Sequence, residues 1–198
     1  MLKELLKDYK IILASGSPRR QQFFKDLDLD FEIRLKEVEE IYPPTLKAAE
    51  ITNFLAELKA NAFENELSPN EILITSDTIV WQNEKALGKP KNYDDAFQIL
   101  KSLSNATHEV ITSVCFKTMH SSETIHEITR VTFSELSDDA IHYYLKKYEP
   151  FDKAGAYGIQ EWIGLIGIAK IEGSYSNVVG LPTERVYNYL THKFIFNA

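Results

Sequence analysis

Residues 11–20 read Ile-Ile-Leu-Ala-Ser-Gly-Ser-Pro-Arg-Arg, and this stretch decides the fold class. Its four apolar residues predict a short buried strand, and the small polar residues after Ala14 predict a tight loop. Pro18 suits the first turn of a helix, because its fixed φ and missing N–H are tolerated there. The chain therefore opens as strand, loop and helix, which is the order typical of an α/β protein.

The rest of the chain continues this alternation of strands and helices. Asn92 and Ser137 are good helix caps, Pro182 opens the last helix, and four glycines between residues 155 and 167 favour sharp bends. Strands are predicted over 31–35, 71–76, 78–81, 110–117, 127–133 and 165–171, and helices over 51–62, 92–103, 137–147 and 182–190. We therefore expect a mixed α/β sheet with flanking helices.

Composition limits the class of protein. With 198 residues and 44% hydrophobic content, one domain over residues 1–198 is the default. The net charge of -7 argues against binding a nucleic acid polymer by phosphate neutralisation. Cys115 is the single cysteine, so no disulfide forms within the chain, which fits a reduced compartment. The first ten residues do not resemble a signal peptide, and the longest uncharged stretch, 173–183, is far shorter than the roughly 20 residues that span a bilayer. We expect a cytoplasmic protein without a membrane partner.

The strand-to-helix junction is a candidate phosphate site. Ser15 and Ser17 supply hydroxyl groups, Arg19 and Arg20 supply guanidinium groups, and a helix amino terminus favours anions. The planar guanidinium can donate two hydrogen bonds to phosphate oxygens. An ordinary capped helix with solvated arginines explains the local sequence equally well.

Asp77 interrupts an apolar and β-branched run over residues 72–80. An ionised carboxylate is costly in such a strand unless a ligand, metal or hydrogen-bond donor compensates it, so a functional role is plausible. A bulge at Ser76-Asp77 that turns the carboxylate into solvent is slightly favoured on spacing alone.

Four further residues are weaker candidates. Glu40 lies in an acidic pair before a proline-containing segment, and Lys59 flanks the apolar face of its helix. Lys89 lies in a Gly-Lys-Pro turn without the spacing of a phosphate-binding P-loop, and Gln160 follows a glycine-rich stretch. Each is more often a solvated surface residue. The sequence has no histidine or cysteine spacing typical of zinc sites, no G-x-S-x-G and no G-x-G-x-x-G.

Seven short motifs, taken together and in this order, resemble the Maf family of nucleotide pyrophosphatases. They are LASGSPRR at 13–20, EE at 39–40, LAELKA at 55–60, SDTIV at 76–80, LGKP at 87–90, DKAGAYGIQ at 152–160 and GSYSNVVGLP at 173–182. They cover nearly the whole chain. One departure is Thr75-Ser76, where the family usually has small residues such as glycine and alanine.

The resemblance implies an elongated mixed α/β fold similar to that of inosine triphosphate pyrophosphatases, with two lobes around a nucleotide cleft. It also implies a homodimer, Mg²⁺ or Mn²⁺, and hydrolysis of nucleoside triphosphates to the monophosphate and pyrophosphate. Asp77 matches the proton acceptor. The positions that match the cleft are Ser17, Arg19, Arg20, Glu40, Lys59, Lys89 and Gln160. In the expected mechanism Asp77 deprotonates a metal-bound water that attacks the α-phosphorus, and Glu40 helps to hold the cation.

The resemblance also bears on the substrate. Arg19, Thr78 and Gln160 match the specificity positions of the branch that acts on dTTP and UTP, and the intact AGAYGIQ motif at 154–160 favours that branch. Two alternatives stay open. One is a pyrophosphatase for 7-methyl-GTP or another modified nucleotide, and the other is a non-catalytic nucleotide-binding regulator of cell division, as the family's septum-formation label suggests.

Overall fold

The computed structural model describes residues 2–193, which form two compact units. Within that range, unit 1 comprises 2–77, 112–127 and 180–193, and unit 2 comprises 78–111 and 128–179. The strands are β1 (Lys10–Leu13), β2 (Phe31–Ile33), β3 (Glu71–Gln82), β4 (Lys85–Leu87), β5 (Thr107–Lys117), β6 (Ser122–Phe133) and β7 (Ile168–Glu172). They hydrogen-bond in the order β2-β1-β3-β5-β6-β7, with β4 paired to β3. Strands β3, β5 and β6 each contribute residues to both units.

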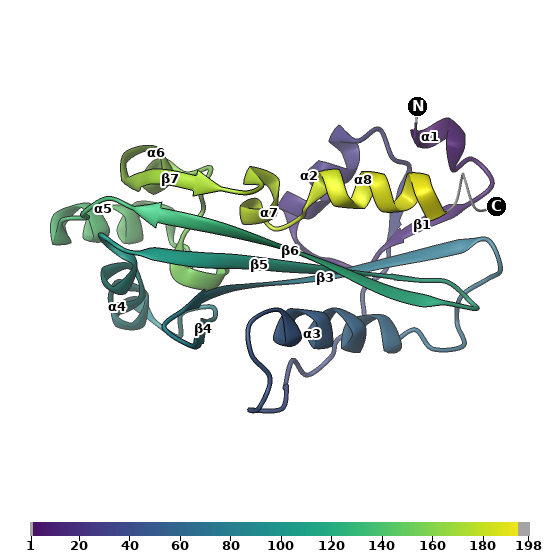
Figure 1. Cartoon of the computed structure of the whole chain (residues 1–198), viewed down its shortest axis with the longest axis horizontal. Coiled ribbons are helices and arrows are strands. Elements are labelled where there is room, and N and C mark those ends of the chain that lie inside the picture. Colours follow the sequence, from purple (N-terminus) through teal and green to yellow (C-terminus); the bar gives the residue numbers. More distant parts are fainter. Residues whose placement is uncertain (1, 194–198) are drawn as a thin grey trace. The chain divides into compact units, whose positions relative to one another are not determined.

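Unit 1 has helices on both faces of its part of the sheet (Figure 1). Its helices are α1 (Leu2–Leu5), α2 (Pro18–Asp26), α3 (Ala49–Asn61) and α8 (Thr183–Thr191). Side chains alternate between the two faces of a strand, and β3 shows this directly. Ile72 and Ile74 pack in a core cluster with residues of α2 and α8, whereas Leu73 packs with Ala56 and Ala60 of α3. Every apolar position in this part of β3 is therefore covered.

Strand β1 is parallel to both of its neighbours. Leu13 pairs with Ile33 of β2 and with Ile74 of β3. Because the carboxyl ends of parallel strands meet at one edge, the loop after β1 begins beside the segment of β3 that contains Ser76 and Asp77. The register alone thus brings two of the sequence motifs together.

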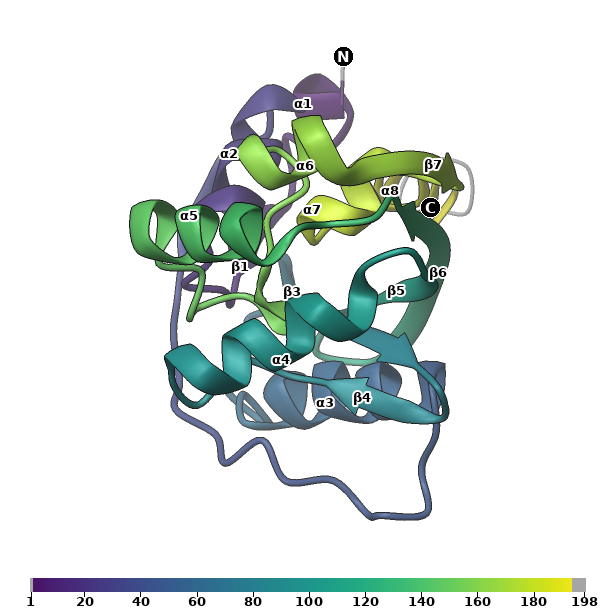
Figure 2. The ribbon, with the colours of Figure 1, turned by 90° about the vertical axis from the view of Figure 1, so that its left-hand side faces the viewer.

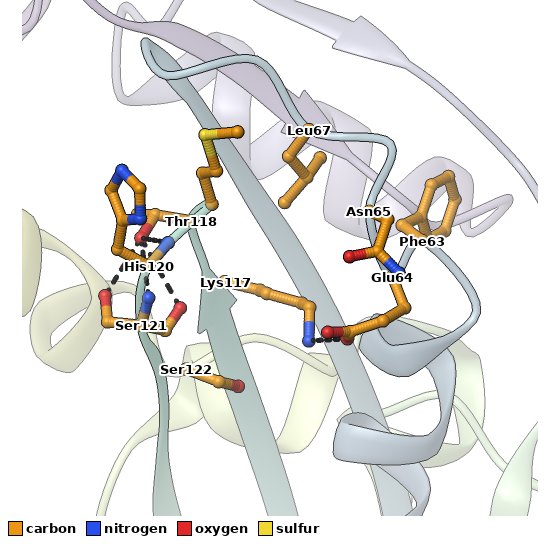
Figure 3. Close-up of a pocket in the computed structure, with 10 residues that line it drawn as sticks. Phe63, Glu64, Asn65, Leu67, Lys117, Thr118, His120, Ser121 and Ser122 are labelled. Carbon is orange, nitrogen blue, oxygen red and sulfur yellow. Dashed lines mark hydrogen bonds and ion pairs between the residues drawn. The ribbon is translucent and has the colours of Figure 1, made fainter.

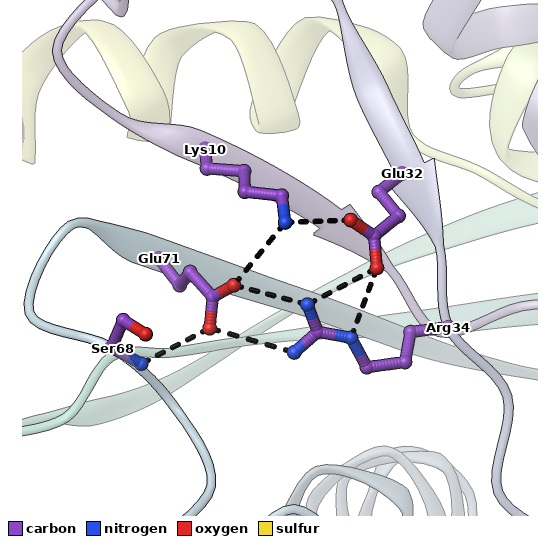
Figure 4. A network of polar contacts seen from close by, with 5 residues as sticks. All are labelled: Lys10, Glu32, Arg34, Ser68 and Glu71. Atoms are coloured by element: carbon purple, nitrogen blue, oxygen red, sulfur yellow. Dashed lines mark hydrogen bonds and ion pairs between the residues drawn. The ribbon is translucent and has the colours of Figure 1, made fainter.

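A network of charges lies beside the starts of β1 and β3 (Figure 4). The carboxylate of Glu71 accepts from Arg34 Nη2 at 3.0 Å and from the amide of Ser68 at 3.0 Å, and Lys10 lies 3.6 Å away. Glu32 bonds to the same Lys10 and Arg34. The hydrogen bonds from Arg34 lower the pKa of Glu71, whose side chain is 7% exposed. This network ties the starts of β1 and β3 to the end of β2.

Unit 2 contains the remaining helices: α4 (Tyr93–Leu103), α5 (Asp138–Tyr148), the 3₁₀ turn η1 (Ala154–Ala156), α6 (Trp162–Gly167) and α7 (Tyr175–Val179). Figure 2 shows α4 and α5 toward the viewer. The predicted caps are present: Asn92 Oδ1 accepts from the amide of Asp95 at 2.9 Å, and Ser137 Oγ accepts from the amide of Ala140 at 3.2 Å. None of the helices within residues 2–193 is long and apolar enough to cross a bilayer.

The predicted mixed sheet with flanking helices is confirmed, and two local predictions are wrong. Strand β3 continues through Ser76 and Asp77, and the Asp77 carboxylate is buried against a cationic partner within unit 1 instead of turning into solvent. The strand predicted over 165–171 begins only at Ile168, since residues 162–167 form α6. There Ile163 and Gly167 are buried at a spacing of four residues, and Gly167 lies against Phe133, where even a Cβ would come within 2.9 Å.

Candidate functional site

Arg20 joins three segments of unit 1 that are far apart in the sequence. Its Nε donates to the carbonyl of Gly180 at 2.8 Å, and its Nη1 donates to the carbonyl of Ser76 at 3.0 Å and to Ser15 Oγ at 3.4 Å. Burial lowers the pKa of Arg20, and the charge of Asp77 opposes this shift. A guanidinium stays protonated under such conditions, so a fixed positive charge lies beside the end of β1.

The amino terminus of α2 carries positive charge. Ser17 is the N-cap, but its side chain makes no capping hydrogen bond, and the first turn contains no acidic residue. Instead Arg19 and Arg20 occupy that turn, although the helix dipole disfavours cations there. The amide of Ser17 donates to Ser15 Oγ at 3.3 Å, which orders the loop between strand and helix. This helix start is therefore better suited to bind an anionic ligand than a helix start without the two arginines would be.

Asp77 and Glu40 meet on one ammonium group. Lys59 Nζ in α3 lies 2.7 Å from Asp77 Oδ1 and 2.9 Å from Glu40 Oε1. The side chains of Asp77 and Lys59 are 10% and 17% exposed, whereas that of Glu40 is 48% exposed. Glu40 comes from the long connection over residues 34–48, which runs along the bottom of the view in Figure 2. Two carboxylates from different segments thus converge on one cationic centre.

The two residues before Asp77 differ in how their side chains are held. Thr75 shares the α3-facing side of β3 with Asp77, and its hydroxyl donates to the carbonyl of Ala56 at 2.6 Å. Ser76 is 1% exposed, and its Oγ has no hydrogen-bond partner within residues 2–193. Its carbonyl accepts from Arg20, so the backbone at this position contributes more than the side chain.

The carboxylates fit a divalent cation that shares its coordination with a substrate. Residues 2–193 contain no group of three or more histidine, cysteine, aspartate or glutamate side chains that could hold a metal. Mg²⁺ is commonly held by only one or two carboxylates together with water and substrate phosphates. Glu40 and Asp77 already direct one oxygen each at a single cation, so they provide such a pair.

The other expected substrate contacts belong to unit 2. Thr78 follows Asp77 in β3, and Lys89 and Gln160 are exposed. The amide of Gly155 donates to the carbonyl of Gly88 at 3.1 Å. This bond joins the loop that contains Lys89 to the glycine-rich segment that ends at Gln160.

A cavity of about 480 Å³ in unit 1 lies outside these residues (Figure 3). It is formed by the segment after α3 and the turn between β5 and β6, and its lining includes Phe63, Leu67 and Met119. The lining also includes Lys117 and Glu64, whose charged groups bond to each other at 2.6 Å. None of the candidate site residues lines this cavity.

A family model described as Maf-like protein matches residues 10–193. The chain belongs to this family. Among its relatives, the dTTP/UTP pyrophosphatase of Flavobacterium johnsoniae is 74% identical over 96% of this chain and 98% of its own length. The protein of the same name from Flavobacterium psychrophilum is 68% identical over 98% of this chain and its full length, and that from Phocaeicola vulgatus is 52% identical over 94% and 97%. The family expected from the motifs is therefore confirmed.

Two solved structures show a weaker likeness to this Maf-like chain. The Ham1 protein of Staphylococcus aureus is 16% identical, with a TM-score of 0.47 over 65% of this chain and 72% of that protein. A nucleoside-triphosphatase, or dITP/XTP pyrophosphatase, from Mycobacterium abscessus is 10% identical, with a TM-score of 0.46 over 93% and 94%. Both scores lie below 0.5, and the family assignment rests on the sequence matches alone.

Proposed function

We propose that this Maf-like chain is a nucleoside triphosphate pyrophosphatase that hydrolyses dTTP and UTP to the monophosphate and pyrophosphate. The observation that carries the proposal is the buried Asp77, held by Lys59 at 2.7 Å on a strand whose neighbouring loop leads into Arg19 and Arg20. The activity named for the relatives at 74% and 68% identity supports the choice of substrates. The match of Arg19, Thr78 and Gln160 to the same branch supports it too.

Asp77 is the proposed catalytic base. In this mechanism its carboxylate accepts a proton from a water molecule as the water oxygen bonds to the α-phosphorus. The bond between that phosphorus and the oxygen bridging to the β-phosphate breaks, and pyrophosphate leaves with the electron pair. Lys59 restricts the carboxylate to one orientation, which favours attack along a line opposite the leaving group.

Positive side chains are proposed to neutralise the triphosphate. Arg19 and Arg20 lie in the first turn of α2, and their fixed charges would stabilise negative charge that develops on the phosphate oxygens. We propose that Ser15 and Ser17 contact the same phosphates. Further contacts are proposed for Lys59, Thr78, Lys89 and Gln160.

The proposal includes Mg²⁺ or Mn²⁺. Glu40 and Asp77 would hold it, because their oxygens already converge on one cation. When bound, the metal would supply Lewis-acid stabilisation of phosphate charge. The ammonium group of Lys59, which lies beside both carboxylates, is proposed to neutralise phosphate charge at the same place.

The test is pyrophosphate release from dTTP, UTP, CTP, GTP and 7-methyl-GTP with Mg²⁺, comparing the natural chain with Asp77→Asn. Loss of a general base lowers turnover by about 10²-fold or more, so the variant should release almost no pyrophosphate. Asp138→Asn is the matched control, because Asp138 also pairs with a lysine, Lys101, but lies at the start of α5. It should keep full turnover.

Each outcome of this panel has one meaning. Release from dTTP and UTP that depends on Asp77 supports both the reaction and the substrates. Release only from 7-methyl-GTP would refute the pyrimidine assignment, and nucleotide binding without any pyrophosphate would favour a regulator. Near-normal turnover in Asp77→Asn would refute the role of the base.

Three properties of the whole chain complete the proposal. We propose one domain, because β3, β5 and β6 each run through both units. The cytoplasm is the proposed location, which the single buried and unpaired Cys115 supports. The resemblance to the family also supports a homodimer, which sedimentation equilibrium would test.

A further inference from the structure

The glycine-rich segment of unit 2 is held by a tyrosine from α5. The amide of Gly158 donates to Tyr144 Oη at 3.0 Å, and Tyr144 Oη donates to the carboxylate of Glu161. Glu161 also lies 3.2 Å from Lys153 Nζ. Tyr144 is fully buried, so its hydroxyl group holds Gly158 within the segment and Glu161 directly after it from inside the core.

A second hydroxyl group holds the residue before Gly158. Tyr157 Oη lies 2.8 Å from Nε2 of His108 in β5, and the two residues are 5% and 2% exposed. Their rings form a cluster with Phe133, whose ring centre lies 5.7 Å from that of His108 and 5.1 Å from that of Tyr157. The segment is thus attached to the sheet as well as to α5.

The histidine is costly in this place. Burial lowers the pKa of His108 to about 4, so the ring is neutral near pH 7. Its Nδ1 has no hydrogen-bond partner within residues 2–193. A buried polar atom without a partner destabilises the folded state, and an apolar residue would avoid this cost. The pair therefore contributes a fixed position for Tyr157 more than stability.

The backbone of the segment is unusual at two positions. Gly155 has φ 72°, and Ala156 has φ 57°, so two successive residues adopt the left-handed conformation. A Cβ on Gly155 would lie 2.6 Å from Val80 Cγ2. Gly155 therefore lies close against Val80 of β3, where a larger residue would clash.

The fixed segment presents Gln160 at its exposed end. A terminal amide offers one acceptor and one donor group, which match the N3–H and O4 of uracil or thymine. Turned by half a rotation, the same amide matches the N4 amino group and N3 of cytosine. A glutamine whose amide group can turn freely therefore cannot distinguish uracil or thymine from cytosine. In this structure Nε2 of Gln160 lies only 3.0 Å from where a Cβ on Gly158 would be, so the side chain folds back over a residue that Tyr144 holds.

We propose that Tyr144 and the His108–Tyr157 pair are positioning residues that fix the segment 154–160 and thereby give Gln160 its preference for uracil and thymine over cytosine. The inference rests on the proposed function, because it takes the segment as the contact to the base. It deepens that function by assigning base selectivity to three buried residues that touch neither the phosphates nor Asp77.

The experiment compares Tyr144→Phe and Tyr157→Phe with the natural chain. Each substitution removes one hydroxyl group and keeps the ring. Affinities for the non-hydrolysable α,β-imido analogues of UTP and CTP are measured by calorimetry, and backbone amide exchange is followed over residues 154–161. Because small displacements of a contact have large effects, both variants should lose roughly tenfold in the ratio of UTP-analogue to CTP-analogue affinity. Exchange at Gly158 should also become faster.

Phe133→Leu is the matched control, since its ring packs on His108 and Tyr157 without holding the segment by a hydrogen bond. It should lower stability but keep the natural ratio. The inference is overturned by an unchanged ratio in both tyrosine variants, by an equal loss in Phe133→Leu, or by a natural chain that fails to prefer the UTP analogue. Selective binding without pyrophosphate release would instead refute the proposed catalysis and leave the inference standing.

Discussion

Lys59 in α3 and Asp77 in β3 form an ion pair of 2.7 Å although 18 residues separate them along the chain. Both side chains are largely withdrawn from solvent, and Glu40 adds a second carboxylate to the same ammonium. An intact buried ion pair contributes little net stability, but removal of one partner leaves an uncompensated buried charge, which is strongly destabilising. The pair is therefore a sensitive point for both stability and turnover.

We expect Lys59→Met to lose stability and turnover together. The substitution leaves Asp77 buried without its cation, which should lower the free energy of unfolding by about 2 kcal/mol. Turnover should fall at least tenfold, because the carboxylate loses its orientation. Urea unfolding and pyrophosphate release measure the two effects.

Lys117→Met is the control for that prediction. Lys117 is also withdrawn from solvent, with a side chain 12% exposed, and pairs with Glu64 at 2.6 Å away from the candidate site. The Lys117→Met variant should be less stable than the natural chain but keep its turnover. Equal turnover in the two variants would contradict the role of Lys59.

The residues before Asp77 should respond in opposite ways. Thr75→Val removes the 2.6 Å hydrogen bond to the carbonyl of Ala56 and should lower the free energy of unfolding by about 1 kcal/mol. Ser76→Ala removes a buried hydroxyl group that has no partner within residues 2–193, so stability should stay the same or rise by up to about 1 kcal/mol. Thermal and urea unfolding of the two variants measure this difference in stability. A larger loss in Ser76→Ala than in Thr75→Val would refute this account.

Glu71 should make stability depend on pH. Its folded pKa lies below the ordinary value of 4.5, mainly through the hydrogen bonds from Arg34. The carboxylate therefore contributes stability that is fully present above about pH 5.5 and is lost as pH falls through the folded pKa. At pH 7 Glu71→Gln should be less stable by about 2 kcal/mol, and the difference should vanish in acid.

Urea unfolding between pH 3 and pH 7 tests the Glu71 prediction. Glu32→Gln is the control, because Glu32 bonds to the same Lys10 and Arg34 but is 43% exposed. At pH 7 the loss of stability in Glu32→Gln should be smaller than that in Glu71→Gln. A constant difference between Glu71→Gln and the natural chain across this range would contradict the proposed linkage.

Gly155→Ala should strain the glycine-rich segment. The positive φ of 72° is unfavourable for alanine, and the new methyl group would lie 2.6 Å from Val80 Cγ2. We expect a loss of about 2–3 kcal/mol in the free energy of unfolding. Adding Val80→Ala should cost less in this variant than in the natural chain, because it removes the clash. Gly88→Ala, where a Cβ would have no neighbour within 4 Å, should change stability little.

Much of this fold could be predicted from local patterns. The apolar run before Ser15, Pro18 at the start of α2 and the caps Asn92 and Ser137 act within a few residues, so their effect is visible in sequence. The secondary structure of residues 162–167 was harder to predict from local patterns. There the glycines favour bends, but burial against Phe133 stabilises a short helix.

The candidate site was only partly predictable for a physical reason. Arg20 could be singled out by its type and position, but it donates to the backbone carbonyls of Gly180 and Ser76, and a backbone carbonyl has no signature in the sequence. His108 could not be singled out from the sequence, because its partner Tyr157 comes from a segment 49 residues away. The burial of His108 and its contact with Tyr157 depend on how these two segments pack in the folded chain.

The sequence by itself determined the order of strands and helices, the family and the set of chemically suitable residues, because propensity, capping and motif order are local properties of the chain. Only the tertiary structure decided that Asp77 stays in a continuous strand. That outcome depends on α3 packing against β3 so that Lys59 reaches the carboxylate. A buried charge is tolerated where a distant partner compensates it, and the distance between such partners is set by packing and not by sequence separation.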